Sequence, residues 1–198
     1  GTLAEMIQRD PVFSGVALTA MVRPGRSAAL ATVHDAAGLV AAGPDLVVEC
    51  AGHSAVGTAA AECLAAGIDT VLASIGALAD DGLHRRLLEA ARAGGARMIL
   101  PAGAIGGTDL LAALKPSGIS SVIYEGRKAP AAWAGSPAEQ ACDLQQLTRA
   151  TTFFDGSARE AALRYPKNAN VAATLALAGL GFDDTQVRLI ADPSAPGN

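Results

Sequence analysis

One segment of the sequence combines polar side chains that could bind a ligand with an uncharged helix that could hold them. Lys167, Asn168 and Asn170 come directly after Pro166, and residues 171–180 carry no charge. Such an apolar helix is expected to be buried, and amide or ammonium groups at its start then need partners. A ligand with carboxylate or carboxamide groups would supply them. The alternative is a capped core helix with Asn168 as N-cap and Lys167 in solvent, and the segment alone favours neither.

Three turns rich in glycine and alanine follow predicted strands. They contain Ala51 and Gly52, then Gly76, and then Gly103 and Ala104. The carboxyl ends of strands in a doubly wound sheet line its ligand crevice, and glycine lets the backbone approach a phosphate or a planar ring closely. Any one of these glycines is better explained by the need for a turn. Three such turns at one edge together favour a cofactor site.

The first hundred residues alternate predicted strands and helices. Strands are expected at residues 16–22, 45–50, 70–74 and 97–100, and helices at residues 2–9, 53–67 and 80–94. The strands are continuous apolar runs, as in a parallel sheet that is covered on both faces. We therefore assign residues 1–102 to a Rossmann-like, doubly wound α/β domain that binds a dinucleotide, without a visible first strand.

The pattern changes after Pro101. Helices are expected at residues 108–114, 157–163 and 171–180, and strands at residues 120–124, 148–154 and 186–191. Residues 125–130 are expected to form a polar loop after the strand that precedes them. Because strands and helices no longer alternate strictly, we assign residues 103–198 to an α+β domain.

Composition narrows the classes of function. Hydrophobic residues make up 51% of the 198 residues and charged residues 17%, so a folded core is readily formed. A net charge of −4 and an aromatic content of 4% argue against nucleic-acid binding. No membrane span and no signal peptide are visible. The cysteines, Cys50, Cys63 and Cys142, match no zinc or other metal pattern and no disulfide framework, which favours a reducing cytoplasm.

The usual glycine fingerprint of dinucleotide-binding domains is not visible. Gly1 could be its last glycine, and we expect the chain to be part of a longer polypeptide. Arg23 and Arg26 follow the first predicted strand, where a carboxylate would normally hold a ribose diol, so NADP is as plausible a cofactor as NAD. Two exposed arginines in a turn are the alternative. His53 follows a strand end, and we interpret it as a helix-start residue before a catalytic one.

The motifs taken together resemble the L-aspartate dehydrogenase family over nearly the whole chain. They occur in this order: Leu46-Val-Val-Glu-Cys-Ala-Gly52, Ser74-Ile-Gly-Ala-Leu78, Gly103-Ala-Ile-Gly106, Ile123-Tyr-Glu-Gly-Arg-Lys128 and Tyr165-Pro-Lys-Asn-Ala-Asn-Val-Ala-Ala173. The resemblance implies oxidation of L-aspartate to iminosuccinate with NAD or NADP. The imine then hydrolyses to oxaloacetate and ammonia or feeds NAD synthesis. It also implies a second domain that carries the contact of a homodimer.

The resemblance also implies roles for single residues. The family's cofactor contacts fall on Ala104 and Asn170, and its catalytic histidine is expected about two residues beyond Asn198, so no catalytic residue is assigned. We expect Ala51, Gly52, Gly76 and Gly103 to border the cofactor. We expect Lys167, with Asn168 beside it, to bind the substrate carboxylates, and Arg127 and Lys128 are weaker candidates.

Two alternatives remain open at this point. One is another dehydrogenase or reductase of amino-acid metabolism, acting on homoserine or dihydrodipicolinate. The other is an inactive sensor that binds a dinucleotide and signals through its dimer. Substrate profiling would separate the first alternative, and cofactor binding without turnover would indicate the second.

Overall fold

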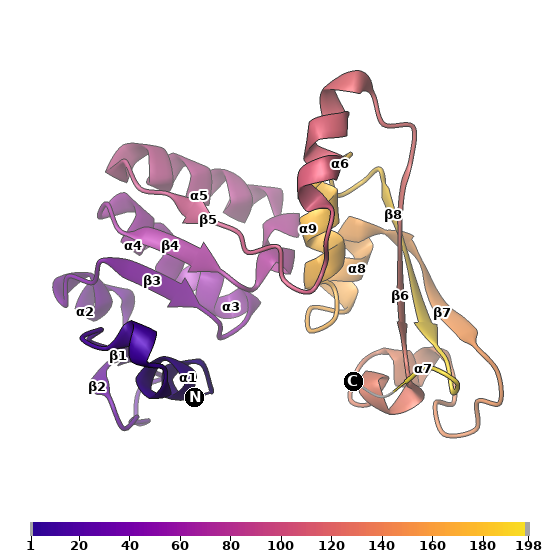
Figure 1. The fold of residues 1–198 in the computed structure, drawn as a ribbon, viewed down its shortest axis with the longest axis horizontal. Helices are drawn as coiled ribbons and strands as arrows, with labels where there is room; N and C mark the ends of the chain where they lie inside the picture. Colours follow the sequence, from indigo (N-terminus) through magenta and orange to yellow (C-terminus); the bar gives the residue numbers. More distant parts are fainter. Residues whose placement is uncertain (1, 197–198) are drawn as a thin grey trace.

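The computed structural model describes residues 2–196, and its elements form two groups (Figure 1). Elements up to β5 (Met98–Ile99) form the first group, and those from α6 (Thr108–Leu114) onward form the second. In the second group, α8 (Ala158–Arg164) and α9 (Asn170–Ala178) lie nearest the first, as the indigo-to-magenta and orange-to-yellow parts of Figure 1 show. These two helices therefore make the junction between the groups.

The first group is built on short parallel strands. β1 (Thr19–Met21) pairs with β2 (Ala31–Val33), and β3 (Leu46–Glu49) pairs with β4 (Asp69–Leu72), which in turn pairs with β5. Every one of these pairs is parallel. Within the β3-β4-β5 sheet the carboxyl ends of the strands therefore meet at one edge, where ligands bind in folds of this kind.

Helices connect and cover these strands. They are α1 (Thr2–Arg9), η1 (Pro11–Phe13), α2 (Ala36–Ala41), α3 (His53–Ala55), the π-helical η2 (Val56–Ala60), α4 (Ala61–Ala65), the 3₁₀ turn η3 (Ile75–Ala79) and α5 (Asp81–Gly94). α5 begins where the sequence predicts, because Asp80 caps it by accepting a hydrogen bond from the Leu83 N–H at 3.0 Å. It ends at Gly95, whose φ of 66° is the left-handed conformation that glycine adopts easily.

The second group is a three-stranded mixed sheet with helices on one face. Its elements are α6, η4 (Lys115–Ser117), β6 (Val122–Lys128), η5 (Pro130–Trp133), α7 (Ala138–Ala141), β7 (Thr151–Ser157), α8, α9 and β8 (Thr185–Ala191). The strand order is β6-β8-β7, with β6 parallel and β7 antiparallel to β8. α8 and α9 pack against this sheet through alanines that are fully buried: Ala158, Ala161, Ala162, Ala172, Ala173 and Ala176. Small side chains let these helices approach the sheet and the first group closely.

One hydrophobic core runs through both groups. Leu64 and Leu87 of the first group belong to the same cluster of buried residues as Val187 and Leu189 of the second. The turn η3 lies between them, and all of its residues are buried. The two groups are therefore packed against each other through a continuous interior.

The structure departs from the sequence-based expectation in several places. The short elements β2, α2, η5 and α7 were not expected, and residues 53–67 form three helical segments rather than one. The strand expected at residues 148–154 is β7, at Thr151–Ser157. Residues 125–128, expected in a loop, continue β6, because they pair with β8 along their whole length. Leu46 and Val48 of β3 are 49% and 41% exposed, so the expectation of full cover on both faces is wrong for that strand. No helix among residues 2–196 is long and apolar enough to cross a membrane.

The close contact of α5 with α4 yields a prediction for stability. A Cβ on Gly94 would lie 2.8 Å from the Gly67 nitrogen and 2.9 Å from the Ala65 carbonyl oxygen, and against the Leu64 carbonyl oxygen as well. These are backbone atoms that cannot move aside singly, so Gly94→Ala should lower the free energy of unfolding by about 1–3 kcal/mol. Urea denaturation measures the change.

Gly57→Ala is the matched control for this substitution. Gly57 is also helical, but a Cβ there would meet no atom within 4 Å. Alanine at this position should be neutral or stabilise the protein by up to about 1 kcal/mol. Equal unfolding midpoints for the two variants would contradict the packing that the structure shows.

Candidate functional site

The Asn170 side chain joins the two groups of elements at a predicted cofactor turn. Asn170 is the first residue of α9, and its Oδ1 accepts a hydrogen bond from the Gly76 N–H of η3 at 3.0 Å. The N-cap of α9 is Ala169, which provides no side-chain cap, so the alternative in which Asn168 caps this helix is wrong. Two of the predicted cofactor residues, 94 positions apart, are therefore brought into direct contact.

The Glu49 carboxylate fixes two of the predicted turns to each other. It lies at the end of β3 with 8% of its surface exposed. Its Oε1 accepts hydrogen bonds from the N–H groups of Ala51 and Gly52 at 2.7 and 2.8 Å and from the Ser74 hydroxyl at 3.0 Å. Its Oε2 accepts one from the Ser74 N–H at 3.0 Å. Four bonds satisfy this buried charge and set the spacing of the turns after β3 and β4.

The turn at Gly103 and Ala104 has the backbone donors that the other turns lack. The N–H groups of Ala51, Gly52 and Gly76 already bond to Glu49 and Asn170. Within residues 2–196, the N–H groups of Gly103 and Ala104 bond to no other group, and both residues are exposed. Gly103 has a φ of 68°, and a Cβ there would meet nothing within 4 Å. This turn fits the close approach of a dinucleotide, with donors left to bind it.

His53 lies directly behind the Gly76 turn. It begins α3, as expected, and a Cβ on Gly76 would lie 2.8 Å from its Nε2. That nitrogen is buried and has no hydrogen-bond partner among the described residues. Burial lowers the pKa of His53, although the Glu49 carboxylate acts in the opposite direction. The imidazole packs against a backbone position that only glycine can occupy without displacing it.

The predicted substrate residues lie beside the junction, on the connection between α8 and α9. Lys167 is exposed, and Asn168 is half-buried. The Lys128 ammonium, at the end of β6, donates a hydrogen bond to the Asn168 Oδ1 at 3.4 Å and lies 5.2 Å from the centroid of the Trp133 ring. Asn168 and Asn170 are two residues apart, so their Cα atoms are at most about 7 Å from each other. The structure thus brings the Lys128 ammonium to the amide-bearing connection that leads into α9.

Arg127 is engaged elsewhere. Its Nη1 donates to the Asp192 Oδ2 at 2.8 Å. Asp192 is 6% exposed and also accepts from the Ser194 N–H and hydroxyl at 2.8 and 2.7 Å. The bonds from Ser194, and then from Arg127, lower the pKa of Asp192 to about 2. Arg127 therefore neutralises a carboxylate of its own chain and is not placed to bind one from a ligand.

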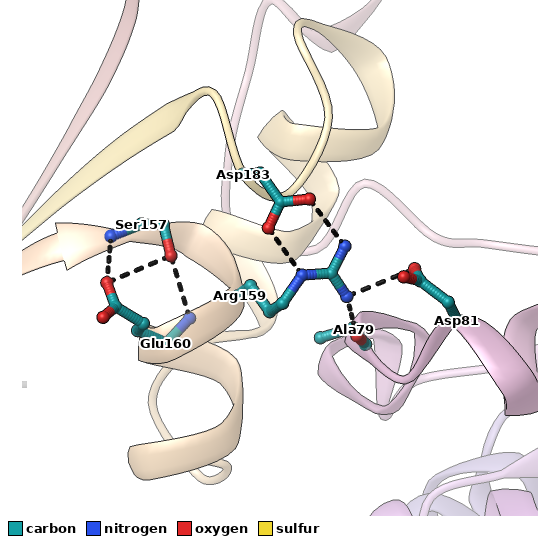
Figure 2. Close-up of polar contacts among 6 residues, drawn as sticks. All are labelled: Ala79, Asp81, Ser157, Arg159, Glu160 and Asp183. Atoms are coloured by element: carbon teal, nitrogen blue, oxygen red, sulfur yellow. Dashed lines mark hydrogen bonds and ion pairs between the residues drawn. The ribbon is translucent and has the colours of Figure 1, made fainter.

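Arg159 holds the other end of η3, as Figure 2 shows. Its guanidinium donates to both carboxylate oxygens of Asp183 at 2.6 and 2.9 Å. It also donates to the Ala79 carbonyl and lies 3.2 Å from the Asp81 Oδ1. The carboxylates of Asp183 and, to a lesser extent, Asp81 raise the pKa of Arg159. Because α8 starts with the capping box of Ser157 and Glu160, the helix that carries Arg159 is itself fixed.

Surface hollows of about 280 and 640 Å³ lie at residues 7–16 and 139–145, away from the predicted site residues. The part of the chain that the structure describes contains no group of three His, Cys, Asp or Glu side chains that could hold a metal ion. Gly1, the expected last glycine of the fingerprint, and Asn198, about two residues before the expected catalytic histidine, lie outside the described residues.

Sequence reasoning missed Glu49 and Arg159, which position the predicted residues. The signal for Glu49 was an acidic residue that closes an apolar strand directly before an Ala-Gly turn. No local sequence pattern pointed to Arg159, because its partners Asp183 and Ala79 lie 24 and 80 positions away.

Two protein-family models match the sequence, one in each half. The model described as "Homoserine dehydrogenase, NAD binding domain" matches residues 14–101, and the model described as "Aspartate dehydrogenase, C-terminal" matches residues 109–198. L-aspartate dehydrogenase 2 of Bordetella pertussis is 46% identical over all 198 residues, which span 74% of that protein. The chain belongs to the L-aspartate dehydrogenase family. The resemblance inferred from the motifs is thereby confirmed.

Comparisons with other members of the L-aspartate dehydrogenase family support this assignment. The L-aspartate dehydrogenase of Pseudomonas aeruginosa is 58% identical over 155 residues, which are 78% of this chain and 58% of that protein. The chain therefore matches less than two thirds of the length of this relative. The crystal structure of aspartate dehydrogenase from Thermotoga maritima superposes with a TM-score of 0.76 at 27% identity, over 98% of this chain and 76% of that one. The predicted Rossmann-like α/β fold with a second, C-terminal domain is confirmed.

The Glu49 network predicts a local loss of order on substitution. Glu49→Gln replaces one acceptor oxygen by an NH₂ group that must face an N–H or O–H donor. We expect the free energy of unfolding to fall by roughly 1–3 kcal/mol. We also expect amide exchange of Ala51, Gly52 and Ser74 to accelerate, which NMR can measure. The exposed Glu62→Gln should change neither quantity, and unchanged exchange at the three amides in Glu49→Gln would contradict the network.

The low pKa of Asp192 predicts that the stability of the protein depends on pH. Its folded pKa of about 2 lies below its ordinary value of 3.8. The stability that the ionised carboxylate gives to the folded protein is therefore fully present above pH 3.8 and is lost as the pH falls toward 2. Asp192→Asn should therefore be less stable than the unsubstituted protein at pH 6, and the gap should narrow by about pH 2. Urea denaturation at both pH values measures it. A gap that is constant with pH would contradict the assignment.

Proposed function

We propose that the protein oxidises L-aspartate to iminosuccinate with a nicotinamide dinucleotide, the imine then yielding oxaloacetate and ammonia. The contact between Asn170 and Gly76 carries this proposal, because it joins a Rossmann-type turn to the polar segment that the family shares. The names of the relatives at 46–58% identity support the same activity.

The residues of this chain suit the cofactor in complementary ways. Gly103 and Ala104 offer N–H donors, whereas Ala51 and Gly52 offer small surfaces whose N–H groups are already bonded. Gly76 is buried and acts through its hydrogen bond to Asn170. The Asn170 NH₂ group remains to donate, because its Oδ1 is taken by Gly76. When bound, the nicotinamide supplies the acceptor for the hydride that leaves the aspartate Cα. Arg23 and Arg26 are exposed and support NADP as an alternative to NAD.

The substrate requires cationic groups and a proton acceptor. We propose that Lys167 and Asn168 border the aspartate, since they lie two or three residues before Asn170. The substrate amine must be neutral before hydride can leave, and a histidine suits this step near neutral pH. The family resemblance places that histidine outside the described residues.

We further propose residues 1–102 and 103–198 as the dinucleotide and substrate domains of a homodimer. The sheet of β6, β7 and β8 supports a dimer contact, because the helices α8 and α9 cover only one of its faces. Ile123, 50% exposed, lies next to the charged pairs of Arg188 with Glu125 and Asp155.

We also propose a cytoplasmic location and a role in NAD synthesis. All three cysteines are free, which supports a reducing compartment. The iminosuccinate product supports the role in NAD synthesis.

Absorbance at 340 nm tests the proposed reaction. L-aspartate should drive reduction of NAD⁺ or NADP⁺ by the purified protein, and oxaloacetate with ammonium should drive the reverse. Binding of either dinucleotide without turnover would contradict the proposal and favour an inactive sensor. Turnover of homoserine in place of aspartate would contradict the substrate.

Asn170→Ala separates the cofactor side of the site from the substrate side. It removes a contact to the cofactor turn and a free amide donor, so we expect the KM for the dinucleotide to rise about tenfold. Asn168→Ala, on the same connection, should instead raise the KM for aspartate. The two roles would be wrong if both variants changed the same KM.

A further inference from the structure

We propose that Lys128 binds the side-chain carboxylate of the substrate and so selects a dicarboxylic amino acid. This inference rests on the proposed function and names a specificity residue within that site. The Lys128 ammonium has few partners within the described part of the protein itself.

Lys128 is half-buried and under-coordinated. Its Nζ makes one long hydrogen bond, 3.4 Å to the neutral amide oxygen of Asn168. Among the described residues, no carboxylate oxygen lies within 4.0 Å of it. An ammonium has three donors, so Lys128 keeps donors for an anion.

The neighbouring cations differ in this respect. Arg127, the preceding residue, is paired with Asp192 at 2.8 Å, and Arg159 on the other side of the junction is paired with Asp183 at 2.6 Å. Lys167 is exposed, with no salt bridge among residues 2–196. Lys128 is therefore the partly buried cation near the junction that lacks a carboxylate.

The side chain of Lys128 is held in place before any ligand binds. Its ammonium lies 5.2 Å from the centroid of the Trp133 ring, which is fully buried. Trp133 in turn donates from Nε1 to the Ile190 carbonyl oxygen of β8 at 3.2 Å. A cation positioned over an anchored ring loses less rotamer entropy on binding than a freely exposed lysine does.

The order of residues along the junction decides which carboxylate Lys128 takes. Starting at the cofactor turn, Gly76 contacts Asn170, Asn168 follows two residues earlier, and Lys128 contacts Asn168. Hydride leaves the substrate Cα, so Cα and its α-carboxylate belong at the cofactor end. The side-chain carboxylate lies one carbon farther out, which is the end at Lys128.

Lys128→Met tests the assignment, because methionine keeps the apolar stem against Trp133 and removes the charge. We expect the KM for L-aspartate to rise at least about tenfold, with the KM for the dinucleotide unchanged. Competitive inhibition by L-asparagine, which lacks the side-chain charge, should not weaken. Lys128→Arg should restore part of the loss, and Lys115→Met, an exposed lysine on η4, should have no effect.

A cooperative urea unfolding transition, followed by circular dichroism, shows whether each variant folds. Lys128→Gln replaces the methionine variant if that one does not fold. An unchanged KM for aspartate would overturn the proposal. Inhibition by L-asparagine that weakens as much as aspartate binding would move Lys128 to the α-carboxylate and overturn it as well. Absence of aspartate turnover in the unsubstituted protein would instead contradict the proposed function.

Discussion

The hydrogen bond from the Gly76 N–H to the Asn170 side chain is the contact on which the rest of the site depends. It fastens the buried turn η3 of the first group to the first residue of α9 in the second. Arg159 holds the other end of the same turn through Ala79 and Asp81. η3 is thus bonded to the second group at both ends, which places the carboxyl edge of the first sheet beside the polar segment before α9. A ligand that touches both sides can then be bound without a large ordering cost.

The turns at the carboxyl edge of the first sheet differ in the backbone donors that they leave for a ligand. Glu49 uses the donors of Ala51, Gly52 and Ser74, which makes those turns rigid but leaves few of their N–H groups for a ligand. Only the turn at Gly103 and Ala104 combines exposure with donors that no other described group uses. Backbone shape and backbone donors are thus supplied by different turns of one site. On the proposed substrate side, the Asn168 side chain accepts a hydrogen bond from the Lys128 ammonium.

Sequence reasoning predicted the long elements and the polar segment because their signals are local. α5 has both its caps in the sequence, and Asn170 stands out against an uncharged helix. β2 and α2 were missed because they are only 3 and 6 residues long, so that pairing and packing rather than periodicity define them. The polar loop expected at residues 125–128 continues β6 because β8 supplies a partner strand, which no local pattern could indicate. Contacts between distant positions, such as Arg159 with Ala79, are likewise absent from any local pattern.

The most direct test of this account is an NMR titration of the isotopically labelled protein with NAD⁺ and, separately, with NADP⁺. The backbone amides of Gly76 and Ala104 and the side-chain amide of Asn170 should shift together, with the same saturation. Shifts confined to other regions, with these three signals unchanged at saturating dinucleotide, would contradict the claim that the junction at η3 is the cofactor site.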